Sequence, residues 1–236
     1  MLAHSRPLLT KQALASLGDD PNVKAIVRCD DFSNKDLREV LYDWSECNGH
    51  PSHRRIVYHT TLPAGTGAAR NDVIRTSENS IFGRGDYLYL SDNDVFFYPA
   101  IFEKLVPIYE FAKSKGFVIL GAYNHPYHQP VSFTRVLAGP CAGVCRIKEV
   151  QALALQSMLM SWDVWDKYGP FNETPPGRVC MGEDVDFCHK ILKDGGRIGV
   201  VDPPLVVNCG LTNSFGEKIP GWELVAAEAP KGVYVE

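Results

Sequence analysis

The sequence predicts an α/β protein with a mostly parallel, mixed sheet flanked by helices. Short apolar runs alternate with amphipathic stretches, which is the pattern of successive β-α units. The chain has 236 residues, of which 45% are hydrophobic and 22% charged. That length buries a full core, and the composition excludes disordered, collagen-like and coiled-coil proteins. We therefore expect a single domain over residues 1–236, with two halves, 1–121 and 122–210, that share one sheet, and a tail, 211–236.

The first half justifies this class element by element. A helix is expected from Pro7 because leucines and alanines recur on one face, and Gly18 suits its end. Only three residues precede the segment His-Ser-Arg-Pro at 4–7, so either the first strand is very short or the chain begins late in it. Apolar runs and i, i+3, i+4 spacing give the rest: strand 23–27, helix 36–47, strand 56–58, helix 68–76, strand 87–90, helix 99–114 and strand 117–120.

The second half has a looser pattern. Prolines and glycines between 126 and 140 indicate loops or short strands. Order returns at 158–168 and in a helix at 184–193, followed by strands at 198–201 and 205–207. The elements after 121 are thus expected to complete the sheet that the first half begins.

Charge and cysteine content exclude some functions. The chain carries 24 Lys and Arg against 28 Asp and Glu, a net charge of −4, which argues against nonspecific nucleic-acid binding. No apolar run approaches the ~20 residues of a membrane span, and the start has no secretory pattern. The seven cysteines include no C-x2-C pair, so we expect reduced thiols and a cytoplasmic location, with peripheral membrane contact left open.

The first chemical motif is Asp92-Asn93-Asp94, directly after an apolar strand. Carboxylates at i and i+2 project to one side of an extended chain, at the strand end where open α/β sheets bind ligands. Such oxygen ligands suit Mg²⁺ or Mn²⁺, which bridges protein carboxylates to substrate phosphates. A polar turn after a strand is the alternative reading of the motif alone.

Two further segments follow strands. Asp30 and Asp31 could accept hydrogen bonds from a base or a ribose, although the same segment could cap the next helix. Residues 65–71, Gly-Thr-Gly-Ala-Ala-Arg-Asn, let the backbone approach a ligand, and Arg70 offers a fork for phosphate oxygens at a helix N-terminus.

Glu183 and Asp184 open the late helix. Acidic residues in a first helical turn complement the helix dipole, which is the structural explanation. The alternative is catalytic, because a carboxylate at the mouth of a site can act as a general base on a hydroxyl.

The order of these motifs resembles the family 2 glycosyltransferases, which have the GT-A fold. That family shows x-N-R-P before a helix, D-D-x-S after the second strand, N-x-G-x-x-x-A-R-N, D-x-D, G-x-F-(D/N)-E, and E-D before a late helix. The counterparts here are residues 4–7, 30–33, 65–71, 92–94, 169–173 and 183–184. They occur in the same order and span most of the chain.

The resemblance implies a role for each residue. Residues 1–121 would bind a nucleotide diphosphate sugar, with Arg6, Asp30, Asp31, Arg70, Asn71 and Asp92 as its contacts. Asp92 and Asp94 would hold Mn²⁺ or Mg²⁺. Asp184, with Glu183 beside it, would deprotonate the acceptor hydroxyl. Trp162 and Trp165 would build the acceptor pocket, or simply pack in the core.

The sequence departs from the family pattern at two positions. Ser5 replaces the usual Asn, and Asn208 stands where many relatives carry a metal-binding His. Asn208 can still offer one carbonyl oxygen to a metal.

The implied reaction moves a sugar to an acceptor hydroxyl with inversion. Two other functions stay open: a sugar nucleotidyltransferase, whose Gly-rich loop belongs at the first strand rather than at 65–67, and a degenerate module that binds carbohydrate without turnover. The acceptor is a glycan, lipid, protein or metabolite, with modified DNA disfavoured by the acidic charge.

Overall fold

The structure is a computed structural model of the whole chain. It describes residues 1–18, 20, 22–30, 34–46, 55–60, 65–123, 132–136, 145–173, 182–211, 218, 226–227 and 229–236. Asp31 and most of the segment 124–144 lie outside these residues, and residues 132–136 are described by their backbone.

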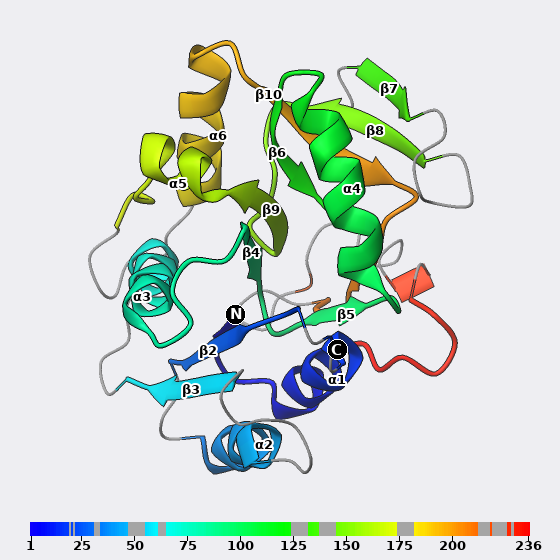
Figure 1. Cartoon of the computed structure of the whole chain (residues 1–236). Coiled ribbons are helices and arrows are strands. Elements are labelled where there is room, and N and C mark those ends of the chain that lie inside the picture. Colours follow the sequence, from blue (N-terminus) through cyan, green and yellow to red (C-terminus); the bar gives the residue numbers. More distant parts are fainter. Residues whose placement is uncertain are drawn as a thin grey trace.

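Helices and strands alternate through the first half and mix in the second (Figure 1). The helices are α1 (Pro7–Leu17), α2 (Lys35–Glu46), α3 (Thr66–Asn79), α4 (Ile101–Lys113), α5 (Trp162–Tyr168) and α6 (Glu183–Lys193). The strands are β1 (Leu2–Ala3), β2 (Ala25–Cys29), β3 (Arg55–His59), β4 (Tyr87–Ser91), β5 (Val95–Phe97), β6 (Phe117–Gly121), β7 (Ser132–Val136), β8 (Cys145–Val150), β9 (Ser157–Ser161), β10 (Arg197–Asp202) and β11 (Val206–Asn208).

The described strands form three sheets, of which one is the antiparallel pair of β5 and β11 and the other two meet at one residue pair. β1, β2 and β3 make a parallel three-stranded sheet, and the second sheet has the order β4-β9-β6-β10-β8-β7. A parallel bridge between Leu2 and Asp92 joins β1 to the end of β4. The chain moves outward from β1 to β3 and then returns to β4, so the strand order reverses between β1 and β4. Open α/β sheets bind ligands at such a reversal, outside the carboxyl ends of the strands.

Helices cover both faces of the sheet. On β4, Leu88 and Leu90 belong to a cluster with residues of α3, α5 and α6, whereas Tyr87 and Tyr89 pack against the cluster of α4. This alternation follows from the two-residue period of a strand. Both faces being apolar explains the nearly continuous hydrophobic runs that predict these strands.

The structure confirms the predicted α/β class and most predicted elements. The first strand is indeed two residues long, and α1 begins at Pro7 and ends before Gly18. The stretch 158–168 divides at Ser161 into β9 and α5. The sequence analysis missed β5 and β8, because β5 is three residues long and β8 carries three charged residues among its six. None of the described helices has the length and apolarity needed to cross a membrane.

Candidate functional site

The turn between β1 and α1 brings Arg6 to the strand-order reversal. Ser5 and Arg6 have φ angles of 50° and 53°, in the left-handed region that residues with a Cβ rarely adopt. Each such residue costs about 1–3 kcal/mol, and such backbone clusters at ligand-binding positions. Pro7 then starts α1, where its fixed φ suits the first helical position.

The acidic turn, residues 92–94, is anchored from two sides. The side-chain amide of Asn93 donates to Thr10 Oγ1 at 2.6 Å and to the Ser5 carbonyl at 3.3 Å. The backbone carbonyl of Asp94 accepts a hydrogen bond from the Cys209 amide at 2.7 Å. Asn93, which the sequence analysis left without a role, therefore fixes the turn so that both neighbouring carboxylates face the reversal.

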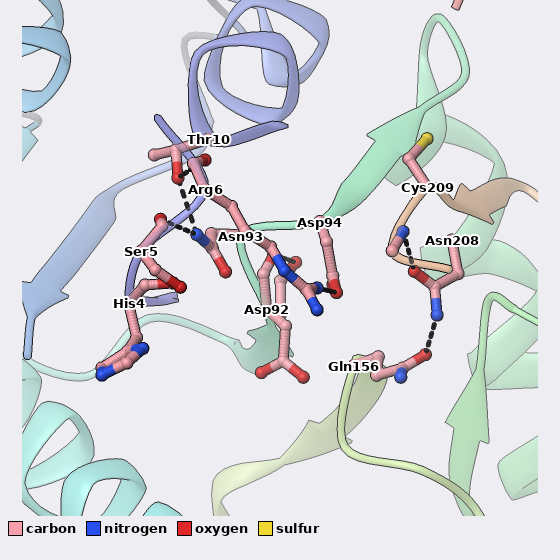
Figure 2. Close-up of polar contacts among 12 residues, drawn as sticks. His4, Ser5, Arg6, Thr10, Asp92, Asn93, Asp94, Gln156, Asn208 and Cys209 are labelled. Carbon is pink, nitrogen blue, oxygen red and sulfur yellow. Dashed lines mark hydrogen bonds and ion pairs between the residues drawn. The ribbon is translucent and has the colours of Figure 1, made fainter. Parts of the chain in front are cut away.

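Arg6 and Asp94 form an ion pair at the centre of Figure 2, with Arg6 Nη1 at 2.7 Å from Asp94 Oδ2. The other carboxylate oxygen of Asp94, Oδ1, is buried and has no hydrogen-bond partner. Burial raises the pKa of Asp94 to about 6 and the charge of Asp92 adds to the rise, while Arg6 opposes it. A buried carboxylate oxygen without a partner is an open position for a cation.

Gly210 lies against this ion pair. A Cβ at position 210 would collide with the Asp94 carboxylate and stand 2.6 Å from Arg6 Nη1. We expect Gly210→Ala to lower the free energy of unfolding by about 1–3 kcal/mol, because the pair must shift to admit the methyl group. Urea denaturation measures this, with Gly85→Ala as the control, since a Cβ there meets only the Tyr87 carbonyl at 3.9 Å. Equal unfolding free energies for the two variants would contradict the expectation.

Arg70, on α3, links the acidic turn to α6. Its Nη2 donates to Asp92 Oδ1 and its Nη1 to Glu183 Oε1, both at 2.8 Å. Arg70 is 7% exposed. Its burial lowers its pKa, but the carboxylates of Asp92 and Glu183 more than reverse the effect, so the pKa rises. In this structure Arg70 bridges two acids, and its contact with phosphate stays a prediction.

Glu183 and Asp184 have different surroundings although they are adjacent. Glu183 is buried and bound by Arg70, so its carboxylate is held in place. Asp184 is half-buried, and one of its oxygens accepts the Val185 amide at 2.8 Å. Burial raises the pKa of Asp184, the neighbouring Glu183 adds to the rise, and Arg70 opposes it. Of the two, Asp184 has the accessible carboxylate with the raised pKa that a general base needs.

Asp30 stands at the end of β2 in a network that the sequence did not predict. Arg28 donates to Asp30 Oδ1 at 2.6 Å and to Asp72 Oδ2 at 2.5 Å, and Thr60 donates to Asp30 at 3.2 Å. Arg28 could have been singled out from the sequence, because it is a charged residue inside an otherwise apolar strand. Its ion pair with Asp30 fixes that carboxylate at the end of β2.

Asn71 holds a loop rather than facing the acids. Its side chain donates to the Phe171 carbonyl and accepts from the Phe171 amide, each at 2.9 Å, and also reaches Glu173 at 2.8 Å. Gly67 lets the same loop lie close to α3, since a Cβ at position 67 would collide with the Asn172 carbonyl. These contacts engage both the nitrogen and the oxygen of the Asn71 amide, so Asn71 holds the loop at Phe171, and its nucleotide contact stays a prediction.

Asn208, on β11, is paired with β5 beside the acidic turn. Figure 2 shows its amide turned toward Gln156, to which it donates at 3.2 Å, while its oxygen accepts the Gly210 amide at 2.8 Å. A carbonyl oxygen has two lone pairs, so one remains for a metal. The orientation of the Asn208 side chain is therefore fixed by its hydrogen bonds to Gln156 and Gly210.

Trp162 and Trp165 are both buried in the core cluster on the α5 side of the sheet. The ring centroids of Trp165 and Phe171 lie 5.3 Å apart with the rings tilted, and the guanidinium of Arg84 lies 4.8 Å from the ring centroid of Trp162. These contacts support core packing, the second of the two interpretations, rather than an acceptor pocket.

The donor set near residues 92–94 fits a divalent cation that substrate oxygens complete. In the described part of the chain, no three His, Cys, Asp or Glu side chains are arranged to hold a metal by themselves. Asp92 and Asp94 offer two carboxylates, and Asp94 keeps one oxygen without a hydrogen bond. Mg²⁺ in proteins commonly binds one or two carboxylates together with substrate phosphates and water.

Comparison with solved structures supports the fold. The crystal structure of GalNAc-T7 with UDP, GalNAc and Mn²⁺ superposes with a TM-score of 0.58 at 13% identity, covering 85% of this chain. This chain spans 41% of the length of that protein. A197 from STIV matches with a TM-score of 0.38 at 14% identity, over 65% of this chain and 70% of that one. The inositol-1-phosphate CTP transferase from T. maritima matches with a TM-score of 0.39 at 12% identity, over 95% and 93%. These last two similarities are too low to support an argument.

The sequence was also compared with curated proteins and with family models. No curated protein matches it. The model of glycosyl transferase family 2 matches residues 1–130, more than half of the chain, and this range holds β1, the acidic turn and Arg70. The chain therefore belongs to glycosyl transferase family 2.

Proposed function

We propose that the protein transfers a sugar from a nucleoside diphosphate sugar to an acceptor hydroxyl, with a divalent cation and with inversion. The observation that carries this proposal is the bridge made by Arg70. It joins Asp92, at the strand-order reversal, to Glu183, whose neighbour Asp184 is the accessible carboxylate. A donor-binding acid and a candidate base thus belong to one connected cluster, although 92 positions separate them in the sequence.

The charge of this cluster favours a cation. Asp92, Asp94, Glu183 and Asp184 contribute four negative charges, and Arg6 and Arg70 return two positive ones. The net negative charge that remains attracts a divalent ion such as Mn²⁺ or Mg²⁺, which Asp92 and Asp94 would hold with Asn208 nearby. When bound, the cation supplies stabilisation of the negative charge on the departing diphosphate.

The protein's own groups supply the rest of the donor site. Asp30, held by Arg28 and Thr60, accepts hydrogen bonds from the ribose or base. Arg6 stands beside Asp94 on a strained turn and carries a charge that a phosphate oxygen can share. Arg6 follows β1, which flanks the reversal, and Asp30 follows the adjacent strand β2, at the sheet edge where this class of sheet binds nucleotides.

Asp184 takes the proton of the acceptor hydroxyl. The acceptor oxygen forms its bond to the anomeric carbon as the bond from that carbon to the diphosphate oxygen breaks, so one displacement inverts the configuration, as in inverting glycosidases. Glu183 is a positioning residue, because its carboxylate is bound by Arg70. The acceptor itself, whether glycan, lipid, protein or metabolite, is to be identified by experiment.

A donor panel tests the proposed function. We expect release of nucleoside diphosphate from at least one nucleotide sugar when Mn²⁺ is added, with water as the acceptor where no other is present. Chelation with EDTA should remove most of the release, because two carboxylates hold the cation with only the substrate to complete its shell. Liquid chromatography of the nucleotide products measures it. Release of pyrophosphate from a sugar phosphate and a nucleoside triphosphate would indicate a nucleotidyltransferase instead, and no turnover at all a binding module.

Calorimetry of the Asp94→Asn variant distinguishes a role of Asp94 in cation binding from a role in nucleotide binding. We expect this variant to lose the Mn²⁺-dependent part of the affinity for nucleoside diphosphate, while the affinity without Mn²⁺ changes little. Glu103→Gln, on the exposed side of α4, is the matched control for the loss of one carboxylate. Unchanged Mn²⁺-dependent affinity in Asp94→Asn would exclude Asp94 as a ligand.

A further inference from the structure

Residues 229–236 pack against α1 and β11, far from them in the sequence. Figure 1 shows the C-terminal end of the chain beside α1. Burial alternates along the segment: Val233 and Val235 are half-buried, whereas Tyr234 and Glu236 are exposed. This two-residue period is the pattern of an extended chain with one apolar face. We name residues 229–236 the clasp.

The apolar face of the clasp covers a small cluster between α1 and the β5-β11 pair. Val233 and Val235 pack against this cluster, which contains Leu9 of α1 and Val207 of β11. Two half-buried valines are little apolar surface for a segment of this length, because ordering each residue of an extended chain costs conformational entropy. Polar contacts must therefore supply much of what keeps the clasp seated.

Gln12, on α1, binds the backbone of the clasp with both ends of its amide. Its Oε1 accepts the Tyr234 N–H at 2.7 Å, and its Nε2 donates to the Tyr234 carbonyl at 3.0 Å. The side-chain amide thus takes the place that the peptide of a neighbouring strand would occupy. These hydrogen bonds fix the register of the clasp, since a slip of one residue would turn its valines outward.

Two residues after Tyr234, the clasp binds the segment 209–211. The Glu236 N–H donates to the Cys209 carbonyl at 3.0 Å, and the Glu236 carbonyl accepts the Leu211 N–H. One residue thereby binds the two positions on either side of Gly210, as in a parallel strand pair. The backbone around Gly210 is therefore held from this side by the clasp.

The other side of the segment 209–211 contacts the acidic turn. The Cys209 N–H donates to the Asp94 carbonyl at 2.7 Å, and Figure 2 shows Asp94 between Arg6 and Cys209. Gly210 lies so close to the Asp94 carboxylate that a Cβ would collide with it. Arg6 directly precedes α1, so α1 reaches Asp94 twice: directly through Arg6, and indirectly through Gln12 and the clasp.

We propose that Gln12 is a positioning residue for the acidic turn: it seats the clasp, and the seated clasp holds Gly210 against the Asp94 carboxylate. With Gly210 in place, Asp94 Oδ2 stays on Arg6 and Oδ1 is left for a cation. With the clasp released, the segment 209–211 withdraws and the carboxylate is free to rotate. This inference rests on the proposed function, because it adds a residue that acts on the same cation site.

Binding of Mn²⁺ alone tests the role of Gln12. We expect Gln12→Leu to weaken Mn²⁺ binding about tenfold at a temperature where the variant is folded, because groups that orient metal ligands without touching the metal contribute about 10–100-fold to affinity. Electron paramagnetic resonance of free Mn²⁺ measures the affinity. Gln151→Leu, at an exposed position after β8, is the matched control and should bind Mn²⁺ as the unchanged chain does.

A second variant releases the clasp from its apolar face. Val235→Asn places a polar amide against the cluster of Leu9 and should also weaken Mn²⁺ binding, whereas Tyr234→Asn changes an exposed side chain and should not. Gln12→Leu combined with Val235→Asn should stay within about twofold of the weaker single variant, because a clasp that is already released cannot be released again. Losses that multiply would overturn the proposal, since each substitution would then act on its own.

Hydrogen exchange without Mn²⁺ separates this proposal from the proposed function. In Gln12→Leu the Cys209 amide should exchange about tenfold faster than in the unchanged chain, while the Leu120 amide of β6 should keep its rate. An unchanged rate for Cys209, or unchanged Mn²⁺ affinity, would overturn the role of Gln12 and leave the proposed function standing. Faster exchange of Cys209 in a chain that binds no Mn²⁺ would instead overturn the proposed cation site and support the role of Gln12 in holding the turn.

Discussion

Replacing Asp184 by Asn should lower the rate of sugar transfer about 10²–10⁴-fold, which is the usual contribution of a general base. The affinity for nucleoside diphosphate should stay within a factor of about two, because Asp184 stands on α6 rather than at the donor-binding turn. Transfer is measured by release of nucleoside diphosphate with the donor found in the panel, and affinity by calorimetry. An equal loss of both would show that Asp184 serves the structure and not the reaction.

Stability provides a second readout for Asp184→Asn. Burial raises the pKa of Asp184, so the folded protein is destabilised by its ionised form at neutral pH. Asn removes that charge and can still accept the Val185 amide, so the melting temperature should stay the same or rise. Asp186→Asn, on the same helix turn and exposed, is the matched control and should keep most of its activity.

The dependence of transfer activity on pH follows from the same raised pKa of Asp184. A base acts when it is deprotonated, so activity falls as the pH drops through the pKa of Asp184. Because that pKa is raised, the acid limb should lie at higher pH than for an ordinary aspartate. The limb should be absent from the residual activity of Asp184→Asn.

Replacing Arg70 by Met should lower the free energy of unfolding by about 3–5 kcal/mol, the usual effect of removing one partner from a buried ion pair. Asp92 and Glu183 would then remain at the sheet edge without the guanidinium that each contacts at 2.8 Å. Guanidinium chloride denaturation measures this loss. The Mn²⁺-dependent affinity for nucleotide should fall too, since Arg70 orients Asp92.

Two further variants show that the geometry of Arg70 matters. Arg75→Met, on the same helix, removes an exposed cation 4.0 Å from Glu173 and should cost no more than about 0.5 kcal/mol. Arg70→Lys should recover only part of the stability, because one ammonium cannot replace a fork that reaches two carboxylates. Full stability in Arg70→Lys would mean that charge alone accounts for the role of Arg70.

The sequence predicts the strands and helices well where one periodicity holds over a whole element. The apolar run 87–90 and the helical spacing of 36–47 identify β4 and α2 because local burial dictates both. The motif order also predicts which acids gather at the strand ends. For these elements the local sequence pattern agrees with the tertiary structure, so predicting them requires no knowledge of distant contacts.

The contacts that decide what each residue does are not local. Arg70 meets Glu183 across 113 positions, and Asn71 meets Phe171 across 100, so neither partner can be read from spacing. The sequence analysis assigned Arg70 to phosphate because a Gly-rich turn before a helix suggests an anion, and the family resemblance implied a nucleotide contact for Asn71. In the folded chain the hydrogen bonds described for both side chains go to protein groups.

The acidic turn also has a consequence for how the protein is made. The Asp94 carbonyl is held by the Cys209 amide, and the Cys209 carbonyl accepts the amide of Glu236, the last residue. Contacts between residues so far apart in the chain form late, after the cost of closing long loops has been met. In synthesis and refolding alike, the turn therefore reaches its final geometry only after the segments at Cys209 and Glu236 have docked beside it.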